Sequence, residues 1–88
     1  MTEREVLIVN PLGLHARPAA QIVRIASGFA ANVWLAKDGE EINGKSIMGV
    51  MMLAAECGCT LVIRAEGSDE AEAVEALAAL VADGFGEA

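Results

Sequence analysis

The dipeptide Asp38-Gly39 constrains the fold of this chain more than any other feature of its sequence. Both residues tolerate the positive backbone φ angles of the tight turns that join neighbouring antiparallel strands. The stretch 32–37 ahead of it alternates between two sets of side chains, and the stretch 40–43 behind it is short and followed by a further turn signal. We therefore predict a β-hairpin with strands at 32–37 and 40–43, and any sheet built on it contains antiparallel pairing.

Helical and strand patterns alternate on either side of this hairpin. Apolar residues at spacings of three and four predict helices, and short runs rich in Val, Ile and Leu predict further strands. Gly28 is a stop signal for the first helix, and Ser46 is a cap for the second. Ser68 or Asp69 caps the last helix, and Asp69 has capping-box spacing to Glu72. The sequence predicts strands at residues 5–9, 32–37, 40–43 and 60–65, and helices at residues 16–27, at 47–53 and from about 69 to Gly84.

This order of elements, β-α-β-β-α-β-α, points to one fold class. Strands alternate with helices, yet the central hairpin forces antiparallel pairing. We predict an α+β fold of two layers, with the helices on one face of an antiparallel sheet. A chain of 88 residues is long enough for one modest core, so we expect a single domain over residues 1–88.

The composition argues against several classes of function. Thirteen acidic residues against six basic ones give a formal net charge of -7. Nucleic acid is therefore an unfavourable partner, because neutralising its phosphates takes clustered Lys and Arg. We expect a cytoplasmic protein, since there is no signal-peptide pattern and no apolar run as long as a membrane span. Cys57 and Cys59 lie too close together for a relaxed disulfide and lack the spacing of zinc ligands, so we expect both to be reduced and no metal to be bound.

The only histidine of the chain, His15, stands where a turn meets the first predicted helix. Residues 10–13 (NPLG) have the composition of a turn. At the N-cap of the helix, the imidazole would lie beside the free N–H groups of Ala16 and Arg17, which together with the helix dipole form a site for an anion. The guanidinium of Arg17 can bond phosphoryl oxygens bidentately. The pattern is typical of a nucleophilic imidazole that carries a phosphoryl group.

The surroundings of His15 favour a carrier over an independent enzyme. The sequence contains no second histidine, no acid–base constellation and no glycine-rich P-loop. A self-contained hydrolase or kinase therefore has little support. The residues alone leave a second interpretation about equally open, in which His15 is a solvated turn residue beside a helix.

Two motifs resemble one known family. Residues 13–20 (GLHARPAA) resemble the active-centre motif of HPr, the histidine-containing phosphocarrier of the bacterial phosphoenolpyruvate-dependent phosphotransferase system. Residues 44–51 (GKSIMGVM) resemble the regulatory serine segment of the same family. Length and element order agree over essentially the whole chain. The resemblance implies an open-faced β-sandwich with three helices on one side of a four-stranded antiparallel sheet.

The resemblance also implies roles for individual residues. His15 would accept a phosphoryl group from phosphorylated Enzyme I, on Nδ1 by family analogy (a pros-phosphohistidine), and would pass it to a histidine of an Enzyme IIA domain. Arg17 would stabilise the phosphoryl group during transfer. Ser46 would be the target of the HPr kinase/phosphorylase. Such a carrier needs no cofactor and contacts membrane permeases only through Enzyme II, and we expect a monomer because it has to fit several partners.

Ser46 also has a physical interpretation of its own. A phosphate at the N-cap of a helix meets the positive helix end, so the fold should tolerate it. Its charge would then repel acidic partner surfaces. The alternative, which the residues alone favour, is that Ser46 only caps the helix.

The short helix behind Ser46 carries a candidate docking patch. Ile47, Met48 and Met51 would offer an adaptable apolar surface to several partners. A core position is about as favourable for Met51, and it is the expected one for Val50 and Met52. Because few basic residues surround the two motifs, we expect docking to depend more on apolar contact than on charge.

The motifs leave a second function open. Relatives of this kind serve nitrogen regulation as well as sugar uptake, and the motifs do not separate the two. The alternative is a regulatory HPr-like binding module, of a nitrogen branch or of catabolite control, that acts mainly through its phosphorylation state.

Overall fold

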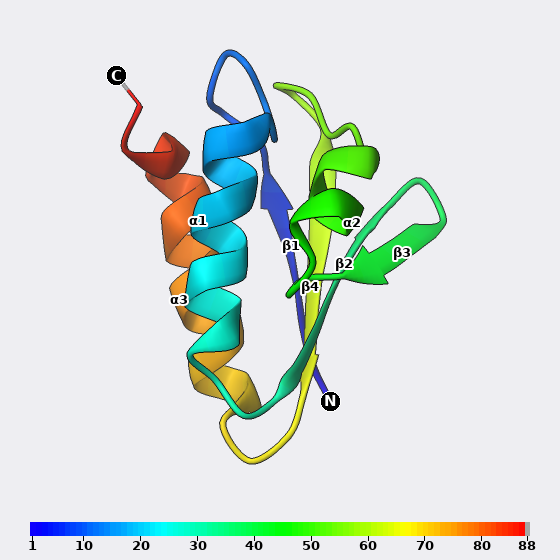
Figure 1. Cartoon of the computed structure of the whole chain (residues 1–88), viewed down its shortest axis with the longest axis vertical. Helices are drawn as coiled ribbons and strands as arrows, with labels where there is room; N and C mark the ends of the chain where they lie inside the picture. The colour runs from blue at the N-terminus through cyan, green and yellow to red at the C-terminus, as the bar shows by residue number, and fades with distance from the viewer. Residues whose placement is uncertain (88) are drawn as a thin grey trace.

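The structure is a computed structural model that describes residues 1–87, and it confirms the predicted order of strands and helices (Figure 1). The bounds of the hairpin strands and of the first helix are those that the sequence predicts, because each is set by a local turn or cap signal. The elements are β1 (Thr2–Leu7), α1 (Ala16–Ser27), β2 (Asn32–Lys37), β3 (Glu40–Asn43), α2 (Ile47–Met52), β4 (Thr60–Glu66), α3 (Glu70–Ala82) and a final 3-10 turn, η1 (Gly84–Gly86).

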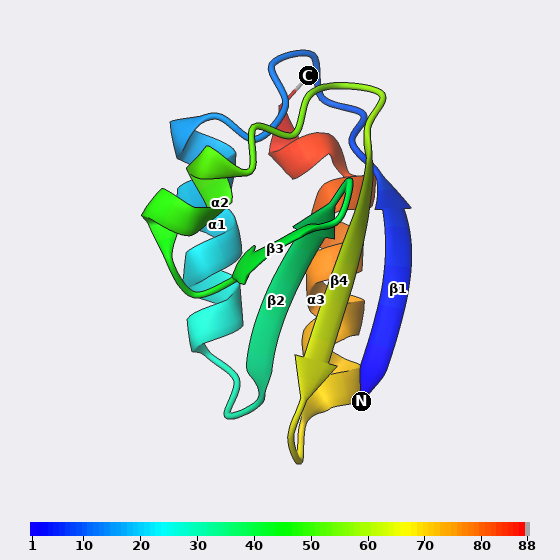
Figure 2. The same ribbon diagram turned by 90° about the vertical axis from the view of Figure 1, so that its right-hand side faces the viewer.

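The four strands form one antiparallel sheet in the order β1-β4-β2-β3. Asp38 and Gly39 close the hairpin between β2 and β3 with φ angles of 50° and 84°, as the sequence predicts. The three helices cover one face of the sheet and leave the other face open (Figures 1 and 2). The α+β class and the open-faced sandwich are therefore confirmed.

The core lies between this sheet and the helices. Side chains on the strands alternate, so that Val33 and Leu35 of β2 are buried while Trp34 and Ala36 face the open side. The helices contribute to the same core Ala19, Ile22 and Ala26 from α1, Val50 from α2, and Val74, Leu77, Ala78 and Val81 from α3.

No helix within residues 1–87 has the length and apolarity needed to cross a membrane.

Strand β1 begins and ends earlier than the predicted range of 5–9. Its polar first half is held in place by contacts with distant segments, since Thr2 pairs with Ala65 of β4 and its hydroxyl donates to Oε2 of Glu70, 2.6 Å away. An edge strand can be polar on its solvent side, and a hydrophobic pattern detects only the apolar part of such a strand.

The capping box predicted at the start of α3 is wrong. The side chain of Asp69 makes no hydrogen bond to its own helix. Its carboxylate instead accepts the backbone N–H groups of Ala30 and Ala31, each at 2.8 Å. These two hydrogen bonds lower the pKa of Asp69, and the one from Ala30 has the larger effect. Asp69 therefore fastens the α1–β2 connection to the start of α3, a contact that spans 39 and 38 positions of the chain.

Glu70 should make the stability of the fold depend on acid pH. The hydrogen bond from Thr2, reinforced by the N–H of Gly67 and the N-terminal ammonium, lowers the pKa of Glu70 to about 2. A carboxylate with a depressed folded-state pKa stabilises the fold above its ordinary pKa and loses that effect as the pH falls through the folded-state value. We therefore expect Glu70→Gln to lower the midpoint of urea unfolding at pH 7, and the difference from wild type to shrink as the pH falls from about 4.5 towards 2.

Glu72→Gln is the matched control for this prediction, because Glu72 is an exposed carboxylate in the same first turn of α3. Urea unfolding of the three proteins, followed by circular dichroism at pH 7 and pH 3, checks it. A Glu70→Gln effect of equal size at both pH values would contradict the assigned role of the carboxylate.

Candidate functional site

His15 is the N-cap residue of α1. Its backbone is extended, with φ -78° and ψ -171°, and its carbonyl accepts the N–H of Ala19 at 3.0 Å. The imidazole makes no capping bond to the helix, and its side chain is 36% exposed. The ring is thus not used to cap the helix, and the backbone carbonyl makes the first hydrogen bond of α1.

The turn before His15, residues 10–14, is held by a hydrogen bond to the loop between α2 and β4. The N–H of Leu14 donates to the carbonyl of Ala55 at 2.9 Å, and the N–H of Gly13 donates to the carbonyl of Asn10 at 3.1 Å. Gly13 has a φ of 65°, and a Cβ atom there would lie 2.4 Å from the carbonyl oxygen of Ala55. Only glycine fits both the backbone conformation and the available space.

A second segment reaches His15 from the far end of the described chain. Gly84, Phe85 and Gly86 follow one another with φ angles of 64°, 60° and 73°, and the Phe85 side chain is anchored at 3% exposure. A positive φ is unusual for a bulky residue such as phenylalanine. This turn directs the chain back over the start of α1, where both views show the red segment beside the blue turn (Figures 1 and 2). It places Oε2 of Glu87 2.9 Å from Nε2 of His15.

Asn10 holds the other oxygen of this carboxylate. Its Nδ2 donates to Oε1 of Glu87 at 3.1 Å and to the carbonyl of Gly13 at 2.8 Å. Asn10 is 2% exposed, and beyond β1 it continues, after Ile8, the alternation of buried and exposed side chains. Asn10, Glu87 and His15 therefore form a continuous row of side-chain hydrogen bonds.

The electrostatics of the site differ from the purely positive surroundings that the sequence indicates. The pKa of Glu87 is lowered, first by the hydrogen bond from Asn10 and then by the hydrogen bond and charge of His15 and the charge of Arg17. Burial of the carboxylate has the opposite effect but does not outweigh them. The carboxylate is therefore ionised beside the imidazole at neutral pH. Sequence reasoning missed Glu87 as a site residue, and no sequence signal could have found it, since 72 positions separate it from His15.

The predicted anion site lies at the N-terminus of α1, directly after His15. Helix geometry leaves the N–H groups of Ala16 and Arg17 without intrahelical acceptors, and Pro18 has no N–H to satisfy. Arg17 is exposed, and it makes no ion pair within residues 1–87. Its guanidinium is therefore not engaged in a salt bridge within the described residues. The binding roles of Ala16 and Arg17 stay predictions.

Ser46 occupies the N-cap of α2, as the sequence predicts. Its Oγ accepts the N–H of Gly49 at 3.1 Å, and its carbonyl accepts the N–H of Val50 at 3.0 Å. The side chain is half-buried. This contact explains the serine as a cap, and its phosphorylation stays a prediction.

The candidate docking residues on α2 are exposed. Ile47, Met48 and Met51 are 45%, 71% and 44% exposed. The expected core position of Val50 is confirmed, but that of Met52 is wrong, because this side chain is 72% exposed. Two residues along a helix correspond to about 200°, so burial of Val50 turns Met52 to the opposite face. The apolar patch on α2 thus consists of Ile47, Met48, Met51 and Met52.

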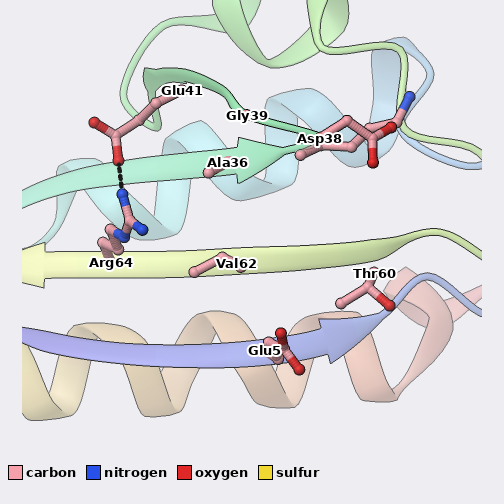
Figure 3. A pocket seen from close by; sticks show the side chains of 9 residues that line it. Glu5, Ala36, Asp38, Gly39, Glu41, Thr60, Val62 and Arg64 are labelled. Carbon is pink, nitrogen blue, oxygen red and sulfur yellow. Dashed lines mark hydrogen bonds and ion pairs between the residues drawn. The ribbon is translucent and has the colours of Figure 1, made fainter.

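The open face of the sheet carries a separate shallow hollow of about 380 Å³ (Figure 3). Ala36 and Val62 are among the residues that line it, and Arg64, also in the lining, pairs with Glu41 and with Glu3. None of the site residues described above lines it. Within residues 1–87 there is also no cluster of His, Cys, Asp or Glu side chains that could hold a metal ion.

Comparison with known proteins relates this geometry to one family. A family model described as the PTS HPr component phosphorylation site matches residues 2–83. The phosphocarrier protein HPr of Cupriavidus necator is 47% identical over 87 residues, which cover 99% of this chain and 98% of that protein.

Solved structures share both fold and sequence with the chain. HPr-C-His from Thermoanaerobacter tengcongensis is 46% identical with a TM-score of 0.96, and the match covers 100% of this chain and 99% of that one. A crystal structure of Crh, a catabolite repression protein of Bacillus subtilis described as a swapped dimer, is 46% identical with a TM-score of 0.77. That match covers 94% of this chain and 95% of Crh.

Proposed function

Because the chain belongs to the HPr family of the phosphotransferase system, we propose that it accepts a phosphoryl group from phosphorylated Enzyme I on His15 and passes it to a histidine of an Enzyme IIA domain. Proteins of this family are carriers rather than catalysts. The observation that carries the proposal is the imidazole at the N-terminus of α1, which makes no capping bond to the helix and is 36% exposed.

The chemistry of acceptance follows from this position. The ring nitrogen attacks the phosphorus of the donor, the donor's P–N bond breaks, and its electron pair returns to the donor histidine. The negative charge on the transferred group is favoured by the N–H groups of Ala16 and Arg17 and by the helix dipole. The exposed guanidinium of Arg17 can bond two phosphoryl oxygens. The same contacts stabilise the group again when it leaves for the next histidine.

A phosphotransfer assay tests the proposal. The protein is mixed with Enzyme I, phosphoenolpyruvate and Mg²⁺, and its mass is followed with and without acid treatment. We expect one added phosphoryl group that is lost in acid, since phosphohistidine is a phosphoramidate, and that moves to an added Enzyme IIA. An unmodified protein would contradict the proposal.

We further propose that Ser46 is a regulatory phosphorylation site for an HPr kinase/phosphorylase and that the apolar patch on α2 docks the partners. Ser46 stands at the edge of this patch, next to the exposed Ile47. A phosphate on Oγ would stay at the helix N-terminus, where its charge is favourable for the fold. Partners would then meet a dianion beside the apolar surface, and its desolvation would weaken docking.

Two substitutions of Ser46 should separate capping from regulation. Ser46→Ala removes the acceptor for the N–H of Gly49 and should destabilise the fold by about 1 kcal/mol, while phosphotransfer to His15 continues at close to the wild-type rate. Ser46→Asp keeps a capping oxygen and adds a charge, so it should retain stability but slow acceptance from Enzyme I. Urea unfolding and the phosphotransfer rate measure both effects, and a rate loss in Ser46→Ala alone would contradict the role of charge.

The similarity to Crh supports a second candidate function, a regulatory module that acts mainly through its phosphorylation state. An acid-stable, ATP-dependent adduct at Ser46 without any adduct at His15 would favour this function over the carrier. We propose that the carrier works as a cytoplasmic monomer, whereas the Crh structure is a swapped dimer. Light scattering after size-exclusion chromatography distinguishes the two states.

A further inference from the structure

The row formed by Asn10, Glu87 and His15 constrains where the proton of the imidazole sits. An ionised carboxylate only accepts hydrogen bonds, so the Nε2 atom that lies 2.9 Å from Glu87 has to be the donor. In the neutral ring the other nitrogen, Nδ1, then carries the lone pair. The orientation of the Asn10 amide is equally determined, because both of its partners on that side, the Gly13 carbonyl and the Glu87 carboxylate, are acceptors.

Burial of the Asn10 side chain is energetically unfavourable, which argues for a role beyond packing. The residue is 2% exposed, and its Oδ1 atom is buried without a hydrogen-bond partner within residues 1–87. Buried polar atoms are rarely left unsatisfied. What the chain gains is an NH₂ group that bridges the turn before His15 and the carboxylate of Glu87, and so fixes both relative to the ring.

We propose that Glu87 and Asn10 are positioning residues for phosphoryl transfer at His15: Glu87 holds the proton on Nε2, and Asn10 holds Glu87. This inference rests on the proposed function. The hydrogen-bond pattern leaves Nδ1, the atom expected from the family resemblance, as the nitrogen with the lone pair.

The pair serves both directions of transfer without moving a proton. When Nδ1 attacks, its lone pair forms the new N–P bond, the donor's P–N bond breaks, and the donor nitrogen keeps that electron pair. The His15 ring becomes positively charged, keeps its proton on Nε2, and faces the negative carboxylate of Glu87. When the group leaves, the N–P electron pair returns to Nδ1, and the protonated ring is a better leaving group than a ring without that proton.

Glu87→Gln should invert the tautomer. Asn10 donates to the Oε1 position of residue 87, so a glutamine there keeps its carbonyl oxygen towards Asn10 and turns its NH₂ towards His15. Facing a donor, Nε2 has to accept, and the ring proton moves to Nδ1. Glu87→Ala removes the restraint without imposing the wrong tautomer. Glu75→Gln, which neutralises an exposed carboxylate on α3 paired with Arg4, is the matched control.

The experiment combines two readouts on proteins labelled with ¹⁵N-histidine. Ring ¹⁵N shifts at about pH 8.5, where an ordinary imidazole is neutral, report the tautomer. Quench-flow with phosphorylated Enzyme I reports the rate of adduct formation. We expect the proton on Nε2 in wild type and Glu75→Gln and on Nδ1 in Glu87→Gln. We expect the rate to fall about tenfold in Glu87→Gln, as expected for one charge-assisted hydrogen bond, and less in Glu87→Ala.

The inference is overturned if wild type carries the proton on Nδ1, or if Glu87→Gln is not the slowest of the four proteins. Failure of the proposed function gives a different result, namely no adduct on wild type. The NMR measurement needs no partner protein, and it still reports whether Glu87 holds the Nε2 proton.

Discussion

A His15→Ala variant should form no acid-labile phosphoryl adduct with Enzyme I and phosphoenolpyruvate. His15 is the only histidine in the chain, so no other imidazole can replace it. The fold should survive the change, because the side chain makes no capping bond, the backbone carbonyl still accepts the N–H of Ala19, and the bond to Glu87 that is lost lies at a partly exposed position. We therefore expect complete loss of acceptance with nearly unchanged stability.

Loss of folding is separated from loss of chemistry by measuring both on the same preparation. Circular dichroism and the urea midpoint should place His15→Ala within about 1 kcal/mol of wild type, the size expected for loss of one partly exposed hydrogen bond, here that to Glu87. Ser46→Ala serves as the companion variant, since it weakens a cap but keeps the imidazole. An acid-labile adduct on His15→Ala would place the phosphoryl group on another residue and remove the basis of the carrier function.

Local signals in the sequence were sufficient for most of the fold. The hairpin at Asp38-Gly39, the helix behind His15 and the cap at Ser46 each depend on residues within a few positions of one another. The burial of Met52 was predicted wrongly because a short helix of six residues gives too few turns to define its buried face. The first half of β1 was missed because its residues are held by β4 and α3 rather than by their own hydropathy.

The site was predictable only in its local half. His15, Arg17 and the helix N-terminus are neighbours in the sequence, so their chemistry can be inferred from spacing. Glu87 reaches the imidazole through a turn built on left-handed backbone angles, including that of Phe85, and no spacing rule connects it to His15. The carboxylate changes the interpretation of the histidine. The sequence indicates a nucleophilic imidazole beside positive groups. The structure adds a negative carboxylate, that of Glu87, which is hydrogen-bonded to Nε2 of the ring.

Gly13→Ala should be the most disruptive single-methyl change near the site. The added Cβ would lie 2.4 Å from the carbonyl oxygen of Ala55, and the residue would have to keep a φ of 65°. Left-handed strain and a backbone collision together predict a loss of about 2–4 kcal/mol in the free energy of unfolding. Relief of the collision displaces the bond between Leu14 and Ala55, and with it the start of α1 that presents His15.

Gly39→Ala is the matched control for this change. Gly39 has a φ of 84° but no atom within 4 Å of an added Cβ, and it lies in the β2–β3 hairpin rather than at the His15 turn. It should therefore show the backbone strain alone, about 1–2 kcal/mol, with phosphotransfer unchanged.

The two variants test whether the turn before α1 is a rigid support for the imidazole. If the contact with Ala55 sets the position of His15, folded Gly13→Ala should accept the phosphoryl group about tenfold to a hundredfold more slowly, since small displacements of a reacting group reduce rates by that order. Measuring the rate well below the unfolding transition keeps stability and chemistry apart. A Gly13→Ala protein that is no less stable than Gly39→Ala, or that transfers at the wild-type rate, would show that the turn adjusts to the methyl group. The position of the imidazole would then depend on its contact with Glu87 instead.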